Sequence, residues 1–80
     1  MHFVYVIKNE NKEFYIGFTG DLEARLKSHN EGLTRSTAHH RWELIYYEAY
    51  ISEKAARNRE RILKHDGRSR RALMDRIKAS

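Results

Sequence analysis

Cysteine and proline are both absent from this 80-residue sequence, which has only four glycines and one tryptophan. Without cysteine there is no disulfide framework and no thiolate metal site, which suits a reducing compartment. No run of about 18 apolar residues is available to cross a membrane, and the first ten residues lack the basic head and long apolar stretch of a signal peptide. These absences predict a cytoplasmic protein without membrane association.

The length predicts one domain, residues 1–80, with a small core. A domain of this size buries only about 60–65% of the surface that its unfolded chain exposes. The core therefore has little room for polar side chains, and any polar side chain that is buried requires an explanation.

Positive charge is concentrated in the last third of the chain. Residues 1–52 contain six Lys/Arg against seven Asp/Glu, a net charge of −1, whereas residues 53–80 contain ten against four, a net charge of +6. Such a one-sided basic block is the electrostatic footprint of a phosphate-binding surface. A solvated helical face is the alternative interpretation, because Arg and Lys are good helix formers.

Three runs of β-branched and aromatic residues predict strands, at residues 3–7, 13–17 and 42–50. The first two flank the polar segment KNENK, which predicts a hairpin turn. In the third run, alternation predicts that Trp42, Leu44 and Tyr46 share one face.

Helix signals fill the remaining segments. Asp21 is a candidate N-cap for a helix to about Asn30, with Gly32 after its end. Ser52 and Glu53 open a second helix to about His65, and Ser69 begins a third. Residues 33–41 are predicted to form a polar loop. The order ββαβαα predicts an α+β fold, a three-stranded antiparallel sheet flanked by helices.

Two polar residues share an edge of the buried face of the first helix. At about 100° per residue, His29 lies in the same arc as Leu22 and Leu26, and Arg25 lies beside that arc. The structural alternatives are a partly buried histidine bonded to a backbone carbonyl, and an ion pair between Arg25 and Glu60 of the second helix.

An ordered set of motifs resembles the GIY-YIG nuclease superfamily over almost the whole chain. Tyr5 in FVY is followed ten residues later by Tyr15-Ile16-Gly17, then by Arg25, and Glu60 lies in the helix after the third strand. The segments FYIGFTGDLEARLKSH, TAHHRWELIYYE and ARNRERILK are similar to the small stand-alone bacterial branch of that superfamily.

The resemblance implies the fold predicted above and a nuclease site. It implies that Tyr5 and Tyr15 are the tyrosines of the two motifs, that Arg25 is the family arginine, and that Glu60 is the carboxylate holding a divalent metal ion. His29 matches a histidine frequent in this branch. Two positions depart from family patterns: Phe3 replaces the opening glycine, and Phe18 replaces a lysine of the excision-repair incision domain.

The residues also suit phosphodiester hydrolysis on chemical grounds. Mg²⁺ keeps several waters and often takes one or two protein carboxylates, so a single Glu60 is sufficient in principle for Mg²⁺ or Mn²⁺. The ordinary pKa of a tyrosine is about 10, which makes it a poor base at neutral pH. Tyr5 would act only if Arg25 or the metal favoured its phenolate or relayed its proton.

Weaker candidates complete the set of site residues. A minor alternative is a zinc site built from four histidines, His29, His39, His40 and His65. An exposed Tyr47 could stack on a single-stranded base. Backbone phosphates are expected to meet the basic residues of the last two helices, Arg59, Lys64, Arg68, Arg70, Arg71, Arg76 and Lys78.

The sequence therefore predicts a metal-dependent endonuclease of DNA, with RNA as an alternative substrate, selective for a structure or a single strand rather than for a sequence. Specificity could also come from a protein partner. A non-catalytic nucleic-acid-binding protein with the same fold is the alternative, and a module for an acidic protein partner is a third hypothesis.

Overall fold

The computed structural model describes residues 1–33 and 35–79, and Thr34 of the predicted loop lies outside them. The strands and α-helices follow one another in the predicted order, ββαβαα. The elements are β1 (His2–Asn9), β2 (Phe14–Thr19), α1 (Leu22–Asn30), the short 3₁₀ helix η1 (Arg35–Thr37), β3 (Trp42–Tyr50), α2 (Glu53–His65) and α3 (Gly67–Ala79). The strand order β2-β1-β3 is antiparallel throughout, so the predicted fold class is confirmed.

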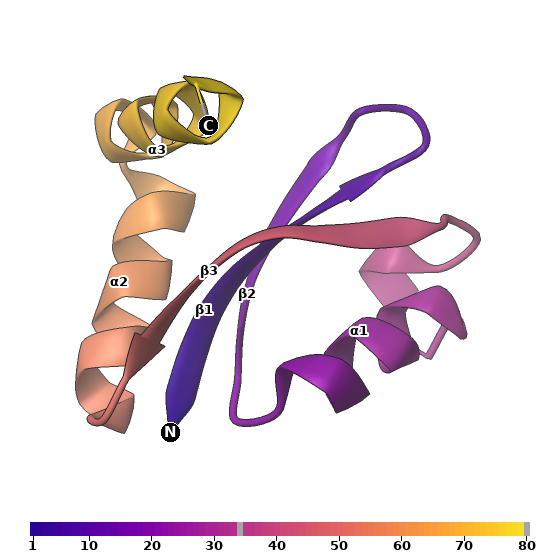
Figure 1. Ribbon diagram of the computed structural model, residues 1–80, viewed down its shortest axis with the longest axis horizontal. Coiled ribbons are helices and arrows are strands. Elements are labelled where there is room, and N and C mark those ends of the chain that lie inside the picture. Colours follow the sequence, from indigo (N-terminus) through magenta and orange to yellow (C-terminus); the bar gives the residue numbers. More distant parts are fainter. Residues whose placement is uncertain (34, 80) are drawn as a thin grey trace.

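The sheet lies between two helical layers, with α1 on one side and α2 with α3 on the other (Figure 1). β1 is the central strand and has helices over both of its faces, so Val4, Tyr5, Val6 and Ile7 are all buried. Val4 and Val6 pack toward Ala56, Leu63 and Leu73 of the α2 and α3 layer. Tyr5 and Ile7 form the other cluster with Trp42, Leu22, Leu26 and Leu44.

A β-bulge in the pairing of β1 with β3 overturns part of the predicted alternation. The register shifts between Val6, which opposes Tyr46, and Ile7, which opposes Leu44. The extra residue switches the side chains that follow it to the opposite face of the sheet. Leu44 thus packs with Trp42 on the α1 face, whereas Tyr46 packs on the opposite face, against the prediction that all three share one side.

Side-chain caps fix the helix starts. Asp21 accepts a hydrogen bond from the Ala24 amide, and Ser52 accepts one from the Ala55 amide, as predicted. The predicted start of α3 at Ser69 is wrong. Asp66 accepts from the Arg68 amide and the Ser69 hydroxyl, so this aspartate caps the helix and Gly67 is its first residue.

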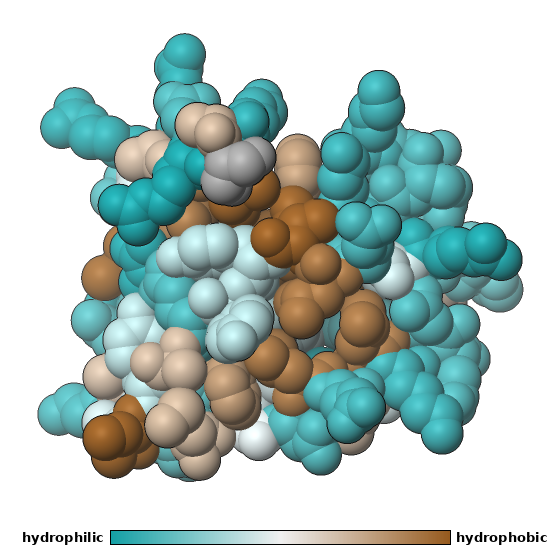
Figure 2. Space-filling view, in the orientation of Figure 1, coloured by the Kyte–Doolittle hydropathy of each residue, from teal (hydrophilic) through white to brown (hydrophobic). Residues whose placement is uncertain are grey.

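The predicted loop at residues 33–41 is also partly wrong, because η1 lies within it and buries Thr37 completely. None of the helices in the described part of the chain is long and apolar enough to cross a membrane. Figure 2 shows hydrophilic side chains on both sides of an apolar band that lies over the strands.

Gly17 sits directly opposite Tyr5 in the sheet. A Cβ at Gly17 would overlap the Tyr5 hydroxyl and ring, so the strand tolerates no side chain here. At Gly20, by contrast, an added Cβ would have nothing within 4 Å. The glycine that ends the YIG motif is therefore needed for space rather than for backbone conformation.

Gly17→Ala is expected to lower the free energy of unfolding by about 1–3 kcal/mol through overpacking. Gly20→Ala is the matched control and should change it by less than about 0.5 kcal/mol. Thermal unfolding followed by circular dichroism measures both. Equal melting temperatures for the two variants would contradict the steric role of Gly17.

Candidate active site

The Tyr5 hydroxyl is the centre of the site. Its side chain extends from the middle of β1 toward α1 and is only 2% exposed. The hydroxyl is hydrogen-bonded to Nε2 of His29, at 2.7 Å. The space for this phenol exists because Gly17, on the neighbouring strand, has no side chain.

His29 is completely buried on the inner face of α1. Its second ring nitrogen, Nδ1, is hydrogen-bonded to the Thr37 hydroxyl at 2.7 Å. The Thr37 carbonyl in turn accepts a hydrogen bond of 2.9 Å from the Trp42 indole. The imidazole is thus held at both nitrogens by side chains, which differs from the backbone carbonyl considered as the structural alternative.

Thr37 was missed by the sequence reasoning as a residue of the site. The only signal was its position at the start of the segment TAHHRWELIYYE, which is similar to the stand-alone bacterial branch of the family. Its burial results from the one turn of η1, and a turn of three residues has too little periodicity to be recognised in a sequence.

Tyr15 brings β2 into the site. Its ring centroid lies 5.0 Å from that of His29 and 6.4 Å from that of Tyr5. On its other side, Nζ of Lys64 lies 5.6 Å from the centre of the Tyr15 ring. Tyr15 is half-buried, so it separates the buried Tyr5–His29 pair from the charged surface of α2.

Glu60 and Lys64 form an ion pair on α2, with 3.1 Å between Lys64 Nζ and Glu60 Oε2. The Glu60 side chain is about one fifth exposed (21%). The spacing of four residues, with the acid first, is the favourable one on a helix. The ion-pair partner of Glu60 is therefore Lys64, and not Arg25 as in the structural alternative weighed from the sequence.

Arg25 and Glu60 both act electrostatically on Tyr5. Burial raises the pKa of Tyr5 to about 12, the Arg25 guanidinium opposes this rise, and Tyr15 and Glu60 add to it. The pKa of His29 is lowered, mainly by burial and then by the charge of Arg25. Tyr5 is therefore a neutral phenol and His29 a neutral imidazole at pH 7, with charged residues around them.

A single carboxylate is available for a divalent ion at this place. Among residues 1–33 and 35–79, no three His, Cys, Asp or Glu side chains are grouped to hold a metal. The four histidines weighed for zinc are therefore not assembled into a site. Glu60 fits the needs of Mg²⁺ or Mn²⁺, which retain waters and take few protein carboxylates, because it is half-buried and its Oε2 already attracts a cation.

Two predicted phosphate-binding arginines have partners within the fold. Arg59 donates to both carboxylate oxygens of Glu48, at 2.9 and 3.0 Å, in a bidentate pair. Arg70 donates to the carbonyls of Leu63 and Lys64 at the end of α2. Arg68 and Arg71 are exposed on α3.

Comparison with known proteins identifies the family. The model of the GIY-YIG catalytic domain matches residues 1–73. The chain belongs to the GIY-YIG family. It is 33% identical over 66 residues to the UPF0213 protein CPE1444 of Clostridium perfringens, covering 80% of this chain and 71% of that one. It is 34% identical over 74 residues to UPF0213 protein YazA of Bacillus subtilis, covering 90% and 75%.

A solved structure extends the likeness to three dimensions. The solution NMR structure of the UPF0213 protein BH0048 from Bacillus halodurans superimposes with a TM-score of 0.60 at 25% identity, covering 96% of this chain and 84% of that one. The predicted resemblance to small bacterial GIY-YIG proteins is thus confirmed. GIY-YIG is a nuclease family, and membership of it implies a nucleic-acid substrate. Members of the family generally depend on a metal ion.

Arg25→Gln is expected to raise the pKa of both His29 and Tyr5, because the guanidinium favours the phenolate and disfavours the imidazolium. NMR titration of the imidazole protons and ultraviolet titration of the tyrosines measure the two changes. Lys27→Gln, on the exposed side of the same helix, is the matched control. A His29 pKa that does not move, or that falls, would contradict the placement of Arg25.

The lowered pKa of His29 also predicts a loss of stability in acid. The imidazole of the unfolded chain has a pKa of about 6.5. Just below this pH the unfolded state therefore binds a proton, whereas His29 in the folded state stays neutral. The free energy of unfolding should therefore fall between about pH 7 and pH 5, and less so in His29→Gln. Urea denaturation across this range measures the difference, and parallel curves would contradict it.

Proposed function

We propose that the protein is a metal-dependent endonuclease that hydrolyses phosphodiester bonds of DNA. The observation that carries this proposal is the convergence of four elements on one hydroxyl. β1 supplies Tyr5, β2 supplies Tyr15, and α1 supplies His29, while Arg25 and Glu60 are near enough to influence the pKa of Tyr5. Membership of a nuclease family supports the reaction class.

Glu60 would hold the divalent ion, Mg²⁺ or Mn²⁺. When bound, such an ion supplies a Lewis acid for the phosphoryl oxygens and lowers the pKa of a bound water. Lys64, paired with the same carboxylate, would then be free to turn toward a phosphate oxygen. The i,i+4 ion pair is partly exposed and costs little to break, because pairs at this spacing on a helix contribute only about 0.3–0.5 kcal/mol.

Arg25 and Tyr15 would bind the scissile phosphate. Arg25 is exposed and carries a permanent charge, which suits the extra negative charge of a phosphoryl transition state. Tyr15 is half-buried between the surface and Tyr5, where its hydroxyl would orient a phosphate oxygen or the attacking water.

Tyr5 and His29 would manage the proton. With a pKa of about 12, Tyr5 alone is a poor base at neutral pH. Its hydroxyl contacts a neutral imidazole at 2.7 Å, and Nδ1 of that ring is held by Thr37. As Tyr5 takes a proton from water, it would pass its own proton to Nε2 of His29, so that no free phenolate is needed.

The basic residues beyond the site would bind the nucleic-acid backbone without reading sequence. Exposed Arg68 and Arg71 are the best placed, with Lys64 beside the site. Arg59 and Arg70, which have partners inside the fold, would contribute less. Cutting would then select a DNA structure or a single strand, or take specificity from a protein partner, and RNA is the competing substrate.

A non-catalytic nucleic-acid-binding protein is the second candidate. The high pKa of Tyr5 favours it, because the burial that raises this pKa also keeps the hydroxyl away from solvent. The basic surface would serve binding alone equally well.

Glu60→Gln and Tyr5→Phe should each reduce cleavage of labelled single-stranded, duplex and branched DNA by at least about 100-fold, through loss of metal and of proton transfer. Binding in EDTA should persist. Gel electrophoresis with Mg²⁺, Mn²⁺ or EDTA measures the products.

Glu53→Gln, which removes an exposed carboxylate from the same helix, is the control and should cut normally. Cleavage by Glu60→Gln at the wild-type rate would refute the assignment of the site. Binding without any metal-dependent cutting would establish the second candidate.

A further inference from the structure

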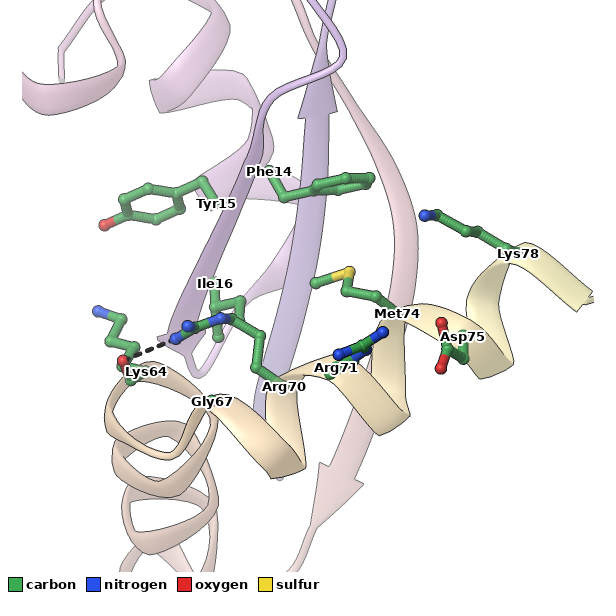
Figure 3. A pocket seen from close by; sticks show the side chains of 10 residues that line it. All are labelled: Phe14, Tyr15, Ile16, Lys64, Gly67, Arg70, Arg71, Met74, Asp75 and Lys78. Carbon is green, nitrogen blue, oxygen red and sulfur yellow. Dashed lines mark hydrogen bonds between the residues drawn. The ribbon is translucent and has the colours of Figure 1, made fainter.

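A groove lies between β2 and the C-terminal helices, and Tyr15 is the residue that it shares with the cluster around Tyr5. It has a volume of about 800 Å³, and Figure 3 shows the side chains that line it. One wall is β2, and the other is the end of α2 with the length of α3. The lining residues are Phe14, Tyr15, Ile16, Lys64, Gly67, Arg70, Arg71, Met74, Asp75 and Lys78.

The groove carries an excess of positive charge. Lys64, Arg70, Arg71 and Lys78 line it against a single anion, Asp75. Arg70 is occupied by the carbonyls at the end of α2, whereas Arg71 and Lys78 are exposed along α3. A polyanion therefore finds cations at both ends of the groove, Lys64 at one and Lys78 at the other (Figure 3).

Phe14 adds an aromatic ring to this basic wall. It is the first residue of β2 and is 42% exposed. Figure 3 shows the Phe14 ring above Met74, with Tyr15 pointing the opposite way from the strand. An exposed phenylalanine that contributes little to the core, between methionine and cations, offers a flat face for a ring of the ligand.

One end of the groove is shared with the candidate active site. Tyr15 and Lys64 line the groove, and Lys64 also pairs with Glu60. A chain of phosphates lying along α3 would thus reach the carboxylate assigned to the metal. Continuity of this kind is expected where a bound substrate has to reach the reactive site.

We propose that this groove binds a segment of single-stranded DNA, with one base stacked on Phe14 and the backbone running past Arg71 and Lys64 toward Glu60. This inference rests on the proposed function and narrows its substrate. The bases of a duplex are stacked on each other and present no face to Phe14, whereas an unpaired strand offers both bases and phosphates.

The test is binding of a fluorescein-labelled oligodeoxythymidylate of about 15 nucleotides, measured by anisotropy in EDTA, where nothing is cut. Phe14→Leu should weaken binding by about 5- to 10-fold, because leucine keeps the apolar volume and loses the stacking face. A duplex of the same length should bind with little dependence on Phe14. Circular dichroism checks that the variant is folded.

Tyr47→Leu tests the rival stacking position suggested by the sequence, since Tyr47 is an aromatic residue 54% exposed on β3 that does not line the groove. It should bind like wild type. A loss of affinity in Tyr47→Leu with none in Phe14→Leu would overturn the proposal and move the stacking site to β3. Equal, Phe14-independent binding of single strand and duplex would also overturn it, as would tighter binding of oligouridylate than of the DNA strand.

Charge is tested by the salt dependence of the same binding. Removing two phosphate contacts in an Arg71→Gln/Lys78→Gln variant should reduce the slope of log affinity against log salt by about 1.4, at about 0.7 for each contact with a single strand. The control, Lys27→Gln/Lys54→Gln, removes the same charge from other exposed positions and should leave the slope unchanged. An identical slope in both double variants would overturn the route along α3.

These experiments distinguish a failure of the groove proposal from a failure of the proposed nuclease activity. Phe14-dependent binding without cutting by any metal would leave the groove in place and refute the nuclease. Metal-dependent cutting that is lost in Glu60→Gln, with no effect of Phe14→Leu on binding, would leave the nuclease in place and refute the groove.

Discussion

The hydrogen bond between the Tyr5 hydroxyl and His29 is the constraint on which the arrangement depends. A tyrosine at the centre of a strand covered on both faces has to find a partner inside the protein, because an unpaired buried hydroxyl costs about 1–3 kcal/mol. Gly17 leaves room for the phenol, and α1 presents the imidazole. Thr37 then holds that imidazole, so strand, helix and loop are fixed by one chain of contacts.

Charge is arranged in layers around this buried pair. Tyr5 and His29 are both neutral at pH 7, and the ions Arg25, Glu60 and Lys64 lie toward the surface. A neutral pair is inexpensive to bury, whereas a buried ion is not. In the mechanism that we propose, this layering would let the hydroxyl and the imidazole exchange a proton while the surrounding charges remain accessible to a phosphate.

Much of this could be predicted from the sequence because it depends on local signals. The strands follow from β-branched and aromatic runs, and the capping residues Asp21 and Ser52 mark two helix starts. The features that were not predicted depend on tertiary contacts. The bulge opposite Val6 and Ile7, the burial of Thr37 and the cap at Asp66 depend on contacts with other segments. The candidate site residues come from the resemblance to the GIY-YIG family, and their roles stay predictions. That resemblance did not predict the Glu60–Lys64 pair.

The helix α3 links the core to the surface that we assign to DNA. Leu73 is buried against α2 and the sheet, which fixes the helix in place. Only Asp66 separates α2 from α3, and it caps the second helix, so the angle between them is set by hydrogen bonds rather than by a loose linker. The cations of α3 are consequently held at a defined distance from Glu60. On our proposal, the cations of α3 and the residues of the candidate active site would then act on the nucleic acid as one rigid unit.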